Sequence, residues 1–90
     1  MDDLLLSKIR LGVIAELLAS ESVSFGELRR ATRTTNGNLG AHLAKLLEGG
    51  YVAEQKTFVN RRPQTRYSLT ETGRSALKRH LREMQALLER

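Results

Sequence analysis

Four side chains between residues 36 and 45 have the chemistry to hydrogen-bond a nucleic acid: Asn36, Asn38, His42 and Lys45. Asparagine can pair with the edge of an adenine, and histidine and lysine suit base edges or phosphate oxygens. A nucleophile, base and acid do not occur together anywhere in a pattern typical of catalysis. The sequence therefore favours binding and predicts that the chain is not an enzyme.

These side chains share one predicted helix, residues 35–48. Thr34 or Thr35 can cap its start, and Gly49 or Gly50 can end it. The core face consists of Leu39, Leu43, Leu46 and Leu47, and the opposite face of Gly37, Asn38, Ala41, Ala44 and Lys45, with His42 on its flank. Glycine in a helix costs about 1 kcal/mol relative to alanine. A polar face made of short side chains would let the helix backbone approach a DNA major groove closely. The alternative is an ordinary core helix whose exposed face is only weakly polar.

A second short helix precedes this one. Ser24 and Glu27 have capping-box spacing, which predicts a helix over 25–31, with Leu28 and Ala31 facing inward. Val23 to Phe25 could also form a very short strand. The link of residues 32–34 is tight, as in a helix-turn-helix, where the second helix enters the groove. We therefore treat residues 25–50 as a helix-turn-helix.

Positive charge is concentrated around this unit. The 90-residue chain carries a net charge of +5, and residues 29–66 hold eight basic residues against two acidic ones. The basic residues are Arg29, Arg30, Arg33, Lys45, Lys56, Arg61, Arg62 and Arg66. A surplus confined to a candidate recognition helix and its surroundings is better explained by a polyanionic partner than by solubility alone.

Residues 51–69 change to the alternating pattern of a β-hairpin. We expect strands over 51–59 and 65–69, joined by a turn over 60–64 that contains Arg61, Arg62 and the only proline. An arginine pair at an exposed tip makes sense if the tip reaches into or along a groove. The alternative is a solubilising loop.

The two terminal helices are candidates for a subunit interface. The first, over 4–19 within residues 1–20, has a core stripe of Leu11, Ile14, Leu17 and Leu18, and Leu5 and Ile9 lie nearly opposite that stripe. The last, over 71–88 within residues 70–90, carries the seam Leu77, Leu81, Met84 and Leu88. A homodimer through these residues is the economical interpretation, and packing within one chain is the alternative.

Length and composition predict one domain of residues 1–90, and they permit a reducing compartment. The chain has no cysteine, which excludes disulfides and thiolate metal sites. Its first residues resemble neither a signal peptide nor a membrane span. We expect a cytoplasmic, nucleoid-associated protein without a cofactor or bound metal.

The chain resembles the small winged-helix transcriptional regulators related to the MarR and ArsR families. The similarity lies in residues 23–28, 36–46, 48–52, 61–67 and 69–73, in that order. It implies an α+β, mostly α fold: a winged helix-turn-helix with a two-stranded wing and a long C-terminal dimerisation helix. It also implies a homodimer on a pseudo-palindromic operator, most often as a repressor. His42 and His80 lie far apart in sequence, so we predict no metal sensing, and the residues point to no effector.

These expectations define a specific DNA contact set. Base edges and nearby phosphates are assigned to the recognition helix: Thr34, Thr35, Asn36, Asn38, Ala41, His42 and Lys45. Phosphate and wing contacts are assigned to Arg29, Arg30, Arg33, Arg61, Arg62 and Arg66. The alternatives are a winged-helix module for protein–protein interaction and a non-specific architectural DNA binder.

Overall fold

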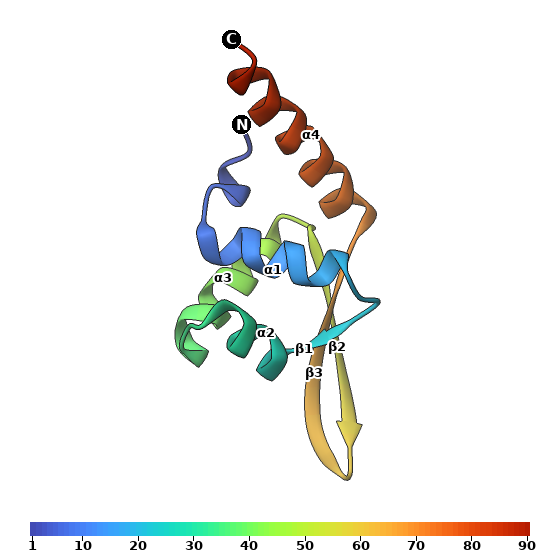
Figure 1. The fold of residues 1–90 in the computed structure, drawn as a ribbon. Coiled ribbons are helices and arrows are strands. Elements are labelled where there is room, and N and C mark those ends of the chain that lie inside the picture. Colours follow the sequence, from blue (N-terminus) through green and yellow to red (C-terminus); the bar gives the residue numbers. More distant parts are fainter.

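The computed structural model describes all residues 1–90 as one short 3-10 turn, four α-helices and three strands. In chain order these are η1 (Asp3–Leu5), α1 (Lys8–Leu18), β1 (Val23–Ser24), α2 (Phe25–Thr32), α3 (Asn36–Glu48), β2 (Val52–Val59), β3 (Arg62–Leu69) and α4 (Glu71–Leu88). Figure 1 shows α1, α2 and α3 gathered beside the sheet, the β2–β3 hairpin projecting on one side, and α4 extending on the other. The predicted mostly helical α+β winged helix-turn-helix is confirmed.

The three strands form one antiparallel sheet in the order β1-β3-β2. The hairpin pairs in continuous register from Val52 opposite Leu69 to Val59 opposite Arg62. The very short β1 adds Val23 opposite Tyr67. Because β1 covers only the base of β3, the outer part of the hairpin is a free two-stranded wing.

The core lies where α1, α2 and α3 meet the base of the sheet. Its twelve buried apolar residues are Leu5, Val13, Ile14, Leu17, Val23, Leu28, Leu39, Leu43, Leu46, Val52, Tyr67 and Leu77. Two residues predicted to face inward do not: Ala31 and Leu18 are exposed. Each lies near the end of its helix, where the chain turns away from the core.

The first helix begins later than predicted. Ser7 caps α1 by accepting a hydrogen bond from the backbone N–H of Arg10 at 3.2 Å, and Asp2 caps the separate turn η1. This break turns Leu5 into the core, where it is only 2% exposed. The prediction that Leu5 faces a second subunit is therefore wrong.

The last helix spans the predicted residues 71–88, and Thr70 caps it by accepting from the N–H of Gly73 at 3.0 Å. Its first turns pack on the domain, so Leu77 is buried and belongs to the core of its own chain rather than to an exposed seam. Every residue from 81 to 90 is exposed. The spacing of the apolar residues could not indicate where α4 leaves the core.

The wing turn is shorter than predicted. Only Asn60 (φ 51°) and Arg61 (φ 66°) connect the strands, and positive φ at both positions identifies a type I′ hairpin turn. The strand β3 therefore begins at Arg62 and includes Pro63. In this register the pair of Phe58 and Pro63 is not hydrogen-bonded, so the missing N–H of proline leaves no gap in the ladder.

A close backbone approach connects α4 to the start of β2. The N–H of Thr70 donates to the carbonyl of Tyr51 at 3.1 Å, and the Thr70 hydroxyl donates to the carbonyl of Gly50 at 2.6 Å. A Cβ at position 73 would overlap the Tyr51 carbonyl oxygen and lie 2.8 Å from Leu69 Cδ1. Only glycine fits this position without a backbone shift.

Replacing Gly73 therefore tests how tightly α4 is docked. We expect Gly73→Ala to lower the free energy of unfolding by about 1–3 kcal/mol, because the added methyl meets backbone that cannot rotate away. Gly12→Ala is the matched control: its Cβ would meet Thr32 Cγ2 at an ordinary 3.5 Å. Urea unfolding followed by circular dichroism should show no loss of stability for the control, and equal stability of the two variants would contradict a tight contact at Gly73.

Candidate nucleic-acid interface

The helix α3 has one buried face and one exposed face, as its sequence predicts. Leu39, Leu43 and Leu46 are at most 2% exposed. The residues exposed on the other side are Asn36, Gly37, Asn38, Ala41, Ala44 and Lys45. Burial of one face fixes the rotation of α3, and the side chains left outside are short enough to let its backbone approach a large partner.

Two threonines hold the start of α3 and its central asparagine. Thr35 caps the helix by accepting from the N–H of Asn38 at 3.1 Å. The side-chain Nδ2 of Asn38 donates to the hydroxyl of Thr34 at 2.8 Å. The Asn38 carboxamide keeps its oxygen and one N–H, which is the donor–acceptor pair that reads adenine. Thr34 therefore orients Asn38 instead of being a free hydroxyl.

His42 is half-buried and has a partner that the sequence pattern did not indicate. The Arg10 Nη1 lies 3.0 Å from His42 Nδ1. Arginine has only donors, so Nδ1 must accept and the proton of the neutral ring lies on Nε2. Arg10 also donates through Nε to the carbonyl of Leu4 at 2.7 Å, which ties α3 to the N-terminal segment.

The environment of His42 favours the neutral form of its ring. Burial lowers the pKa of His42 below its ordinary 6.5, and the positive charges of Arg10 and Lys45 lower this pKa further. The unfolded chain consequently binds a proton more readily than the folded one. The contribution of neutral His42 to the free energy of unfolding is complete above about pH 6.5. This contribution is lost as the pH falls through the pKa of His42 in the folded state.

Arg66, which was predicted to bind phosphate, uses three of its five N–H donors inside the domain. It donates through Nε and Nη2 to the hydroxyl and carbonyl of Ser22, at 2.8 and 3.0 Å, and through Nη1 to Gln64 at 3.0 Å. Glu27 lies 3.9 Å from the same Nη1. Arg66 thus ties β3 to the segment before α2.

Glu27 and Ser24 are joined as the predicted capping box expects. The Glu27 N–H donates to the Ser24 hydroxyl at 3.2 Å. The Glu27 carboxylate accepts from the Ser24 hydroxyl at 2.9 Å. That hydrogen bond is the main reason why the pKa of Glu27 is lowered, and a hydrogen bond with the Ser24 backbone and the charges of Arg66 and Arg30 lower this pKa further.

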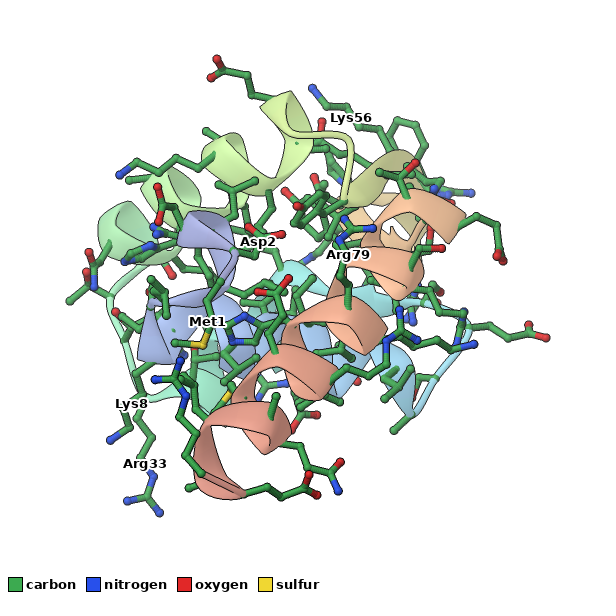
Figure 2. The ribbon with its side chains drawn as sticks, turned by 90° about the horizontal axis from the view of Figure 1, so that it is seen from above. Met1, Asp2, Lys8, Arg33, Lys56 and Arg79 are labelled. Atoms are coloured by element: carbon green, nitrogen blue, oxygen red, sulfur yellow. The ribbon has the colours of Figure 1, made fainter.

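The other predicted cations have no acidic partner. Arg30 and Arg33 are exposed and Arg29 is half-buried along the helix-turn-helix. Arg33 adopts the left-handed conformation that ends α2, with φ 53°, and Figure 2 shows its side chain pointing outward beside Lys8. Arg61 and Arg62 are exposed at the wing tip.

A polar cluster that the sequence analysis missed connects the N-terminus to α4. The Tyr51 hydroxyl donates to the Asp2 carboxylate, and the N–H of Asp2 donates to Nδ1 of the buried His80 at 3.4 Å. Burial and the Asp2 carboxylate raise the pKa of Tyr51 to about 12. No group of three or more His, Asp or Glu side chains could hold a metal ion, and no helix is long and apolar enough to cross a membrane.

The Arg10–His42 contact can be tested by titration. We expect Arg10→Met to raise the pKa of His42, because the variant removes a neighbouring positive charge and keeps much of the aliphatic stem. Lys45→Met should raise this pKa less. The midpoint is measured from the His42 ring protons by NMR, and an unchanged or lower midpoint in Arg10→Met would refute the assigned contact.

Comparison with known proteins agrees with this geometry. A family model described as a winged helix DNA-binding domain matches residues 9–88. An uncharacterized protein of Methanocaldococcus jannaschii is 35% identical over 78 residues, which cover 87% of this chain and 85% of that protein.

Solved structures agree as well. The transcriptional regulator homologue from Pyrococcus horikoshii OT3 has a TM-score of 0.86 and 29% identity, over 96% of this chain and 85% of its own. A MarR family transcriptional regulator from Silicibacter pomeroyi has a TM-score of 0.71 and 26% identity, over 92% of this chain and 55% of its own. The chain belongs to the winged helix DNA-binding domain family.

Proposed function

We propose that this chain is a sequence-specific transcriptional regulator that binds an operator as a homodimer and acts as a repressor. The observation that carries the proposal is the exposed face of α3 with its short polar side chains. On this face Asn38 is oriented by a hydrogen bond from its Nδ2 to the Thr34 hydroxyl at 2.8 Å. A surface that only neutralised phosphates would be expected to present lysine and arginine there. This role would place the protein with the nucleoid DNA of the cytoplasm, and the proposal assigns it no enzymatic step.

In the proposed complex α3 lies in the major groove. Base edges are contacted by Asn36, Asn38, Ala41 and Lys45, and flanking phosphates by Thr35 and the Nε2–H of His42. Gly37 supports this arrangement, because a Cβ there would meet nothing within 4 Å in the free protein. Nothing within the chain therefore requires glycine at this position, whereas close approach to DNA gives a reason for it.

The arginines surrounding α3 supply the phosphate contacts. Arg29, Arg30 and Arg33 position the helix on the backbone, and Arg61 and Arg62 hold the wing at the minor groove. Arg66 is at most a secondary phosphate contact, since three of its five N–H donors are used by Ser22 and Gln64. Contacts of this kind fix register and orientation, while the asparagines of α3 provide the sequence preference.

The free end of α4 supports the proposed homodimer. Leu81 is 52% exposed and Leu88 is 84% exposed, and Met84 and Leu87 are exposed between them. Half-buried Ile9 packs against the core and is at most a secondary contributor. A two-fold dimer would present recognition helices about 34 Å apart, which corresponds to half-sites repeating roughly every 10 bp.

Two other functions make different predictions for DNA binding. A non-specific architectural protein would bind all duplexes equally and with steep salt dependence. A winged-helix module for protein–protein interaction would bind no duplex. The oriented Asn38 favours a specific reader over both.

Selection from a pool of random duplexes tests sequence preference without knowledge of the operator. We expect a recovered consensus with two half-sites, and preference for it over a scrambled duplex that persists as salt rises. Asn38→Ala should reduce the free energy of binding to the consensus duplex by about 1–3 kcal/mol, because it removes a base contact. It should hardly change binding to the scrambled duplex. Arg62→Ala should weaken binding to both duplexes and reduce the slope of log affinity against log salt concentration by about one.

The control for these variants is Lys78→Ala, which removes an exposed charge from α4, away from α3 and the wing. It should leave both affinities nearly unchanged. If Asn38→Ala weakens every duplex equally, the base-reading role is wrong. If no consensus is recovered but all duplexes bind, the architectural function replaces the proposal.

Dimer formation is tested on the exposed turns of α4. Leu81→Lys should give a monomer by sedimentation equilibrium, because it places a charge in the proposed apolar contact, and should weaken binding to the two-half-site duplex. Ser75→Lys adds the same charge to an exposed position of the same helix and should remain dimeric. A dimeric Leu81→Lys protein would show that the subunits meet elsewhere.

A further inference from the structure

Phe58 is exposed in a chain that has very few aromatic residues. Its exposed fraction is 71%, whereas Phe25 and Tyr51 are half-buried and Tyr67 is buried. The chain contains only two phenylalanines and two tyrosines. A large apolar side chain at the free end of the wing contributes nothing to the core and is available for a contact outside the chain.

The strand register determines which way Phe58 faces. Directly paired residues of an antiparallel sheet share a face, so Phe58 lies beside Pro63. The same face carries, at steps of two residues, the buried Val52 and Tyr67 at the base of the sheet. The Phe58–Pro63 pair therefore continues the core-facing side of the sheet beyond the core, as an apolar patch at the wing tip.

The surroundings of this patch are positively charged. Lys56 lies on the same face two residues before Phe58, and Arg61 and Arg62 form the tip. No acidic residue occurs between Glu54 and Glu71. An apolar pair bordered by cations and no anions is complementary to DNA, where the sugars and base edges of the minor groove lie between two phosphate rows. An acidic protein surface would match the cations but would not need the apolar pair.

The patch is also held rigidly. The two-residue type I′ turn fixes the strand ends, and the proline ring limits the backbone opposite Phe58. A rigid apolar tip loses little conformational freedom on binding. Proteins that bind the minor groove frequently insert phenylalanine or proline between base steps and partially unstack them.

We infer that Phe58, supported by Pro63, is a minor-groove contact of the wing that packs against sugars and base edges and loosens the stacking of one base step. This inference rests on the proposed DNA-binding function and adds a contact class that arginine does not supply. Because unstacking is easiest at flexible pyrimidine–purine steps, Phe58 contributes sequence preference at a flanking position that α3 does not touch.

The test compares Phe58→Ala with Val59→Ala on the selected duplex. Val59 is also exposed at the tip, at 46%, but pairs with Arg62 on the opposite face of the wing. Phe58→Ala should weaken binding about tenfold, the effect of removing a buried aromatic contact, without changing the salt slope. Val59→Ala should change affinity less than threefold. Phe58→Leu, which keeps an apolar wedge, should restore most of the loss.

A direct readout uses 2-aminopurine placed at successive positions under the wing. Wild-type protein should raise its fluorescence at one step, and Phe58→Ala should not. Equal affinity of Phe58→Ala and wild type, or an equal loss in Val59→Ala, overturns the inference while leaving the DNA-binding function intact. Loss of dimer mass in Phe58→Ala also overturns it, because the side chain would then belong to a subunit contact. If the wild-type protein binds no duplex, the inference fails together with the proposed function.

Discussion

The close packing of Gly73 against the Tyr51 carbonyl is the contact on which the arrangement of the whole chain depends. Tyr51 lies in the short link between the end of α3 at Glu48 and the start of β2 at Val52, and Thr70 at the start of α4 donates to its carbonyl at 3.1 Å. The recognition helix, the wing and the proposed dimerisation helix therefore meet within a few residues. Because these are backbone contacts, a rotation of α4 cannot be absorbed by a side chain. Subunit pairing through α4 would thus set the spacing of the two recognition helices.

The exposed face of α3 is organised by contacts that use one polar atom of a side chain and leave another available. Thr34 takes one N–H of Asn38, and Arg10 takes Nδ1 of His42. The remaining amide oxygen and the Nε2–H have defined orientations before any partner binds. Side chains that are already ordered lose less entropy in a complex, which benefits both affinity and discrimination.

Positive charge serves two different purposes in this chain. Arg66 is surrounded by acceptors from Ser22 and Gln64 and connects β3 to the helix-turn-helix. Arg61 and Arg62 have no acidic partner and lie exposed at the wing tip. A count of charges does not separate these roles, because a hydrogen-bonded guanidinium and a free one carry the same charge. A free guanidinium can offer all five of its N–H donors to a polyanion, whereas Arg66 has three of its donors engaged inside the domain.

The sequence by itself determined the features that depend on near neighbours. The bounds of α3 and α4, the capping roles of Thr35 and Thr70, and the exposed polar face of α3 follow from side chains within about four positions of each other. Only the tertiary structure decided which apolar residues are exposed and which charged residues lack a partner within the chain. It buried Leu5, which periodicity had assigned to a partner, and paired Arg10 with a histidine 32 residues away. Periodicity identifies an apolar face but not what covers it, since that depends on how distant elements pack.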